Sequence, residues 1–171
     1  NPSATAYVYL RSRPGKGFWD RAGVRTNPLR FDASKGASIT CTGIYAYAIY
    51  VTQPYTRFYG LQIAQTDGTT NAQSAVYSAQ QYTTFDSCII EGNTPTAGVL
   101  ELATGNCSVT RSLVINRKSG AAKIAVLNSG SSAYSTVFAC TGASPAAVGV
   151  DGLYGAPTLR NVHVGHATAP V

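Results

Sequence analysis

Five acidic side chains follow residue 36, and they have the clearest capacity for chemistry in this sequence. They are Asp67, Asp86, Glu91, Glu101 and Asp151. Hydrolysis of a glycosidic bond needs two carboxyl groups, about 5–5.5 Å apart for retention of configuration or about 6.5–9.5 Å apart for inversion. Asp86 and Glu91 are five positions apart, so an extended strand would place them on opposite faces or separate them by its end. Their spacing therefore favours solvated turn or edge groups over a catalytic pair.

Histidine and cysteine offer little metal chemistry. His163 and His166 are the only histidines, and they favour polar surface roles. The cysteines, which form no CxxC pair, are Cys41, Cys88, Cys107 and Cys140. This spacing argues against a zinc site and favours buried free thiols, with one disulfide between neighbouring strands as the alternative. The sequence has no phosphate-binding loop or nucleophile elbow, and we expect neither a cofactor nor a metal.

A hexamer pattern recurs five times and indicates the elements that must position these groups. The copies start at Phe58, Phe85, Val109, Tyr134 and Leu159. Successive starts are 27, 24, 25 and 25 residues apart, and positions one, four and six are apolar apart from Ser112. Such a period is typical of a unit that stacks on copies of itself. Because alternate positions of a strand share a face, the repeating unit is predicted to be a strand.

A second apolar stretch precedes each hexamer by about ten residues, which gives each repeat at least two strands. These stretches are residues 49–51, 75–77, 99–102, 124–127 and 148–150. Ile39 to Cys41 alternates in the same way and indicates an earlier coil. Two or three short strands in about 25 residues predict an all-β, single-stranded parallel β-helix of five or more coils over residues 36–171.

The hexamer resembles the repeat of the right-handed parallel β-helix family. The residues that carry the resemblance are Phe85-Asp-Ser-Cys-Ile-Ile90 and Leu159-Arg-Asn-Val-His-Val164. This family includes pectate lyases, polygalacturonases, and the tailspikes and other virion proteins of bacteriophages. Low charge, a basic N-terminal part and abundant Gly, Ala, Ser, Thr and Tyr are most similar to the virion proteins. Polygalacturonase-like motifs are missing, and Gly165-His166-Ala167 is only a fragment of one.

Residues 1–35 are predicted to form a basic N-terminal arm. They carry seven basic residues against Asp20 and Asp32, a balance of +5, whereas the other 136 residues carry six basic and five acidic groups, a balance of +1. The residues expected to dock the arm onto an acidic partner are Arg11, Arg13, Lys16, Arg21, Arg25 and Arg30. A solvated arm is the alternative. Because Pro and Gly interrupt this segment, we do not expect it to bind nucleic acid.

The arm also contains aromatic residues that could close an end of the stack. An open end would expose apolar interior and unpaired backbone, so a cap is expected. Phe18, Trp19 and Phe31 are the candidates for this cap. A ligand-binding role for these aromatic residues is the alternative.

An apolar stripe is predicted on the outside of three consecutive coils. Ile89, Leu113 and Phe138 occupy the fifth hexamer position, and Ile115 the next outward one. Soluble monomers seldom expose such a stripe. We expect a partner subunit to cover it, with the chain's own arm as the alternative.

Together these features predict a non-enzymatic structural protein on the exterior of a bacteriophage particle, either a capsid decoration or part of a fibre or spike. Its expected partners are copies of itself, with a trimer favoured, or other virion proteins. The alternatives are a polysaccharide lyase or glycoside hydrolase, and a module that binds host glycans through Tyr45, Tyr47, Tyr50, Tyr55 and Tyr59. No apolar run approaches the roughly 20 residues of a membrane span. A chain that starts at Asn1 indicates a processed product or a portion of a longer polypeptide.

Overall fold

The computed structural model describes residues 2–14, 16, 31–43, 46–66, 73–93 and 98–117 with their side chains. It also describes the backbone of residues 124–135, 138–141, 153–160 and 163–166. This part of the chain is all β, with parallel strands in stacked sheets and no helix. Accordingly, no described segment is a helix long and apolar enough to cross a membrane.

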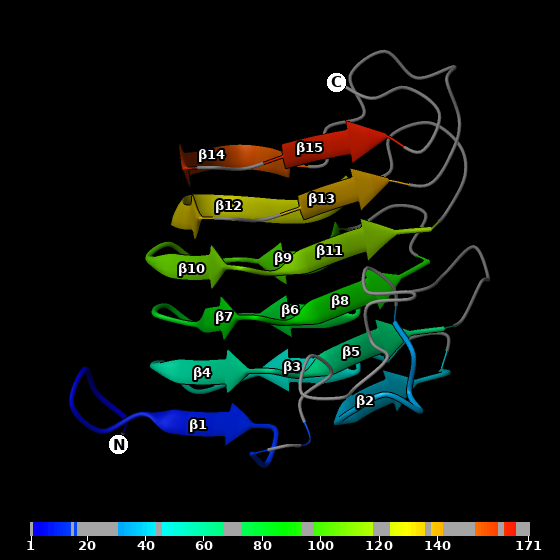
Figure 1. Ribbon diagram of the computed structural model, residues 1–171. Helices are drawn as coiled ribbons and strands as arrows, with labels where there is room; N and C mark the ends of the chain where they lie inside the picture. The colour runs from blue at the N-terminus through cyan, green and yellow to red at the C-terminus, as the bar shows by residue number, and fades with distance from the viewer. Residues whose placement is uncertain are drawn as a thin grey trace.

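The strands form three parallel ladders to which the chain contributes in turn (Figure 1). The first ladder contains β3 (Ile49–Val51), β6 (Val76–Ser78), β9 (Gly98–Leu102) and the first parts of β12 (Ile124–Ser135) and β14 (Leu153–Arg160). The second contains β1 (Val8–Arg11), β4 (Thr56–Tyr59), β7 (Thr84–Asp86), β10 (Cys107–Thr110) and the remaining parts of β12 and β14. The third contains β2 (Ser38–Cys41), β5 (Gln62–Gln65), β8 (Ile89–Gly92), β11 (Leu113–Asn116), β13 (Phe138–Thr141) and β15 (His163–His166).

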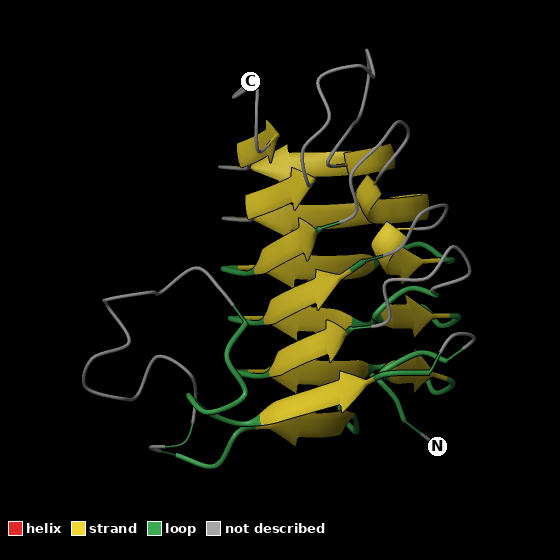
Figure 2. Ribbon diagram, turned by 90° about the vertical axis from the view of Figure 1, so that its right-hand side faces the viewer, coloured by secondary structure: helices red, strands yellow, loops and turns green. Residues whose placement is uncertain are grey.

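The first and second ladders belong to one nine-stranded sheet, because β12 and β14 run through both of them. The third ladder is a separate six-stranded sheet. Figure 2 shows the strands lying one above another, with the loops at their ends. Two sheets that are apolar on their facing sides can bury those sides only against each other.

The five hexamer copies lie in register, as the repeat predicts. Phe58 pairs with Phe85, Phe85 with Val109, Val109 with Tyr134, and Tyr134 with Leu159. We call this series the hexamer column. Leu10 of β1 extends it by pairing with Phe58. The sequence assigned residues 1–35 to a separate arm, but β1 within that range is a strand of the second ladder.

The core lies between the two sheets and is built from the inward positions of all three ladders. The Phe58 and Phe85 rings stack with centroids 4.8 Å apart and planes 5° from parallel. Ile90 and Val114 face them from the third ladder, and Leu100 from the first. Burial of a large apolar side chain contributes about 1.5–3 kcal/mol, so aligned columns of such residues stabilise the stack.

Sharp corners separate the ladders, and each uses one residue with a left-handed backbone. Between the first and second ladders these residues are Tyr55, Tyr82 and Asn106, with φ of 55°, 59° and 61°. Between the second and third ladders they are Gly60, Ser87 and Arg111, with φ of 72°, 55° and 47°. The strand register aligns each set across neighbouring strands. Only Gly60 adopts this conformation without steric cost.

Residues 31–37, which we call the strap, lie on the outer side of the third ladder and lead into β2 (Figure 1). The buried Gln62 side chain holds the strap: its Oε1 accepts a hydrogen bond from Asp32 N–H at 2.8 Å. Its Nε2 donates to the carbonyl oxygens of Asp32 at 2.9 Å and Lys35 at 3.2 Å. The Phe31 N–H donates to Glu91 Oε2 at 3.4 Å. The strap therefore reaches from β2 to the level of β8.

The sequence placed a further first-ladder strand at residues 148–150, which lie outside the described residues. In the structure, Leu153 pairs with Val126 and Tyr154 with Leu127. β14 therefore supplies a strand of the first ladder and continues into the second, with a register shift against β12 between Leu127 and Ser131.

Three cysteines have described side chains: Cys41 and Cys88 are free thiols, and Cys107 is buried. Cys88 is fully buried, and this burial raises the pKa of its thiol to about 12. The expectation of a buried free thiol is confirmed for Cys88, whereas Cys41 is only half-buried.

Candidate functional site

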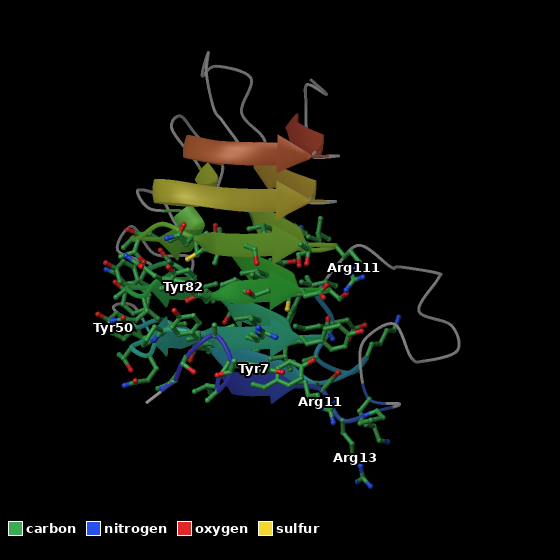
Figure 3. All side chains as sticks on the ribbon, turned by 90° about the vertical axis from the view of Figure 1, so that its left-hand side faces the viewer. Tyr7, Arg11, Arg13, Tyr50, Tyr82 and Arg111 are labelled. Atoms are coloured by element: carbon green, nitrogen blue, oxygen red, sulfur yellow. The ribbon has the colours of Figure 1, made fainter. Side chains whose placement is uncertain are left out.

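A groove of about 240 Å³ lies on the outer face of the second ladder, across β1, β4 and β7. We call it the tyrosine–arginine groove. The lining side chains that matter for its chemistry are Tyr7, Tyr9, Arg57, Tyr59, Thr84 and Asp86. Figure 3 shows Tyr7 and Arg11 at the level of β1, Arg111 higher on the same side, and Arg13 extending away from the strands.

Strand alternation places these side chains outside. Leu10 belongs to the hexamer column, so its neighbours Tyr9 and Arg11 point the other way. The parallel register sets Tyr9 beside Arg57, and Arg11 beside Tyr59. The next strand sets Thr84 beside Arg57 and Asp86 beside Tyr59. The groove exists because β1 pairs with β4.

The aromatic part of the groove consists of Tyr7 and Tyr9. Their rings meet edge to face at 74°, with centroids 6.1 Å apart. They remain 42% and 46% exposed, which leaves apolar ring surface open to solvent. The guanidinium carbon of Arg57 lies 3.7 Å from the Tyr7 centroid, and that of Arg11 lies 5.6 Å from the Tyr9 centroid. Both are cation–π contacts that hold a guanidinium against a ring.

The single carboxylate of the groove is already engaged. Asp86 Oδ1 accepts a hydrogen bond from Arg111 Nε at 2.9 Å, and a second Arg111 nitrogen donates to Asp86 Oδ2. This hydrogen bonding raises the pKa of the Arg111 guanidinium. Ser87 Oγ also donates to Asp86 Oδ1 at 3.0 Å. Asp86 is therefore neutralised by a cation outside the groove.

Two cations in and beside the groove lack acidic partners within the part of the chain that the structure describes. Arg57 and Arg11 contact tyrosine rings, and neither forms an ion pair there. With Asp86 held by Arg111, the local charge is positive. The arrangement can bind an anionic group beside an aromatic surface.

The described carboxylates after residue 36 lie on three different ladders: Asp86 on the second, Glu91 on the third and Glu101 on the first. Asp32, on the strap, forms an ion pair with Lys35. Glu91 pairs with Arg117, and Glu101 accepts a hydrogen bond from Ser74 Oγ at 2.9 Å. Asp67 and Asp151 lie outside the described residues. Within the described ranges, no three His, Cys, Asp or Glu side chains come together as a metal-binding group.

The predicted apolar stripe is a real column, but two of its members are not exposed. Leu113 pairs with both Ile89 and Phe138, as the register requires. Ile89 and Leu113 are only 2% and 7% exposed in the single chain, and Ile115 is half-buried. The side chain of Phe138 is not among those described. A partner subunit is therefore not needed to cover Ile89 and Leu113, contrary to our expectation, since one chain already buries both.

Four of the predicted arm and cap residues fall within the described part of the chain. Arg11 lies beside the groove, whereas Arg13 and Lys16 are exposed beyond β1. Phe31 was predicted to cap an end, and its backbone N–H donates to Glu91 on β8, two strands away from the edge strand β2. The other predicted residues, Arg21, Arg25, Arg30, Phe18 and Trp19, lie outside the described residues.

The tyrosines expected to form one sugar-binding face are divided among three places. Tyr47 and Tyr50 pack with Tyr77 on the first ladder, with centroids 5.3–5.4 Å apart. Tyr55 stacks on Tyr82 at the corner, at 4.5 Å. Of these five tyrosines, only Tyr59 is seen to line the groove, and Tyr45 lies outside the described residues.

Tyr7, Tyr9 and Arg57 were not identified from the sequence as site residues. The alternation of residues 6–10 was a usable signal, because it places Tyr7 and Tyr9 on the face opposite Leu10. Comparisons with protein-family models, curated proteins and solved structures find no match to the chain.

Proposed function

We propose that this chain is a right-handed, single-stranded parallel β-helix that serves as a non-catalytic structural module on the exterior of a bacteriophage particle. The observation that carries the proposal is the hexamer column, which runs in register through six strands from Leu10 to Leu159. In such a stack each strand supports the next through hydrogen bonds and core contacts. A stiff rod of this kind suits a mechanical role.

The order of the strands supports the β-helix. The chain enters the first, second and third ladders in turn and repeats that order with parallel pairing throughout. A parallel pair needs a crossover, and crossovers between parallel strands are overwhelmingly right-handed. The resemblance of the hexamer to the repeat of right-handed β-helices agrees with right-handed crossovers.

The described carboxylates give a polysaccharide-degrading enzyme little support. That alternative needs two carboxyl groups on opposite sides of one sugar-binding groove. Asp86, Glu91 and Glu101 lie on three different ladders, Asp32 lies on the strap, and each of the four has a partner within the chain.

The proposed module docks on the particle through its basic residues and associates with further copies, with a trimer favoured. Arg13 and Lys16 are exposed and free of described ion pairs. Burial of Ile89 and Leu113 limits the self-association surface on the third ladder to its later strands. Ile115 is half-buried there, and Phe138 occupies the next strand.

Immunogold electron microscopy of purified phage particles, with antibodies raised against this chain, tests the proposal. We expect gold on the outside of intact particles, and none after the antibody is absorbed with purified protein. Light scattering of the purified chain should give the mass of a trimer. Antigen found only in the soluble lysate, with unlabelled particles, would contradict the structural role.

A further inference from the structure

We propose that the tyrosine–arginine groove binds an acidic sugar residue of a surface polysaccharide. This binding site is separate from the structural role, which depends on the hexamer column and not on the outer face. Either proposal can fail without the other, because particle labelling and glycan binding are measured independently.

The size and lining of the groove suit a single sugar ring. Sites for drug-sized ligands enclose about 300–1,000 Å³, and the groove encloses about 240 Å³. The carbon-bound hydrogens of a sugar ring form an apolar patch, and the exposed surfaces of Tyr7 and Tyr9 offer a matching one. Because the two rings stand edge to face, they present two sides of a corner instead of one flat platform.

The charges of the groove favour an acidic sugar over a neutral one. Arg57 is held over Tyr7 without a described acidic partner, so its N–H groups remain available for an anion. A guanidinium binds a carboxylate through two parallel hydrogen bonds. The Asp86 carboxylate would repel an anion if it were unpaired, but Arg111 neutralises it.

Thr84 adds a donor for a sugar hydroxyl. Ser108 Oγ donates a hydrogen bond to Thr84 Oγ1 at 3.0 Å. A hydroxyl that accepts in this way retains its own proton for donation. Thr84 lines the groove beside Arg57, so one ligand can reach both groups.

The outer face disfavours a polynucleotide. Proteins that bind single-stranded nucleic acid combine stacking rings with a basic track along the backbone. On β7 and β10, the outward column that contains Arg57 continues with Thr84 and Ser108. The column that contains Tyr59 continues with Asp86 and Thr110. The cation of that region, Arg111, is paired with Asp86. The groove offers a place for one anionic group and no path for a chain of phosphates.

Calorimetric titration of the purified chain with trigalacturonic acid tests the inference, with maltotriose as the neutral probe and a dT15 oligonucleotide as the nucleic-acid probe. We expect trigalacturonic acid to bind and maltotriose to bind at least about tenfold more weakly, because a hydrogen bond to a charged group contributes about 1.5–3 kcal/mol. Arg57→Ala should lower the affinity for trigalacturonic acid by about tenfold or more, for the same reason. Arg57→Lys should recover part of it, because it restores the charge but not the paired hydrogen bonds.

Matched variants outside the groove complete the test. Arg13→Ala removes an exposed cation that does not line the groove, and Tyr50→Ala removes an exposed ring on the first ladder. Both should leave the affinity unchanged, whereas Tyr9→Ala should reduce it and retain the parent circular dichroism spectrum. Equal losses in Arg13→Ala and Arg57→Ala would reveal non-specific charge attraction and overturn the proposal. Equal affinity for maltotriose, absence of trigalacturonic acid binding, or tighter binding of dT15 would overturn it as well.

Discussion

The outer faces of the second and third ladders have the same strand geometry but differ in solvent exposure. On the third ladder, Gln62, Ile89 and Leu113 occupy one outward column and are buried. On the second ladder, Tyr9 and Arg57 occupy an outward column beside an open groove. The strap hydrogen-bonds to the first of these faces, whereas Tyr9 on the second is 46% exposed.

This difference shows that an outward position in a stacked sheet does not determine exposure. The apolar residues of the third ladder need a cover, and one chain supplies it. The tyrosines and arginines of the second ladder tolerate water, because each has both an apolar and a polar part. A face that remains open and carries such residues is the better place to look for a ligand.

The largest expected effect comes from the core that supports both faces. Phe85→Ala should lower the free energy of unfolding by about 3–5 kcal/mol, because it removes a fully buried ring and leaves a cavity. Urea denaturation followed by circular dichroism measures this loss. The control is Tyr82→Ala, which removes an exposed ring from the corner stack with Tyr55. It should cost no more than about 1.5 kcal/mol. Equal losses in the two variants would mean that the Phe58–Phe85 stack is not a core contact.

The next effect separates the covered face from the open one. Gln62→Ala removes three hydrogen bonds to the strap and should cost about 1–3 kcal/mol, because buried backbone groups lose their partners. Tyr9→Ala on the open face should cost less than about 1 kcal/mol.

Limited trypsin digestion gives a local measure of the same contrast. Cleavage after Lys35, inside the strap, should accelerate in Gln62→Ala and not in Tyr9→Ala, because release of the strap exposes its backbone. If Gln62→Ala left both the stability and this cleavage rate unchanged, the strap would not depend on Gln62.

The smallest effect concerns the corner where the two faces meet. Cys88 lies between Asp86 of the second ladder and Ile89 of the third, and its burial raises the pKa of its thiol from an ordinary 9.0 to about 12. Between these values the unfolded chain loses a proton that the folded chain retains, so stability is complete below pH 9 and falls as the pH rises. At pH 10 the parent protein should lose about 1 kcal/mol, relative to pH 7.5, that Cys88→Ala does not lose. Urea denaturation of both proteins at the two pH values measures the difference, and parallel pH profiles would contradict it.

Much of the fold could be predicted because it depends on local alternation and a fixed period. The positions of Phe58, Phe85 and Val109 in successive copies were enough to predict their pairing. The pairing of Leu153 with Val126 could not be predicted in this way, because β12 and β14 pair with a register shift between Leu127 and Ser131 that a fixed period does not indicate. The apolar stretch at residues 148–150, which was predicted to be a strand, lies outside the described residues.

The candidate site was much less predictable. Tyr7 and Tyr9 lie about fifty residues before Arg57 in the sequence, and only the pairing of β1 with β4 brings them together. The intervening segment gave no sign that residues 8–11 belong to the stack, because Pro and Gly interrupt the repeat there. The burial of Gln62 was equally hard to predict, since the strap that hydrogen-bonds to it lies about thirty residues earlier in the sequence.

By itself, the sequence determined which side chains share a strand face and how the five hexamer copies pair, because both follow from the two-residue alternation and the repeat length. Only the tertiary structure decided which outward faces are covered and which remain open. The reason is physical: alternation is a local property of the backbone, whereas exposure depends on where a distant segment such as the strap comes to lie.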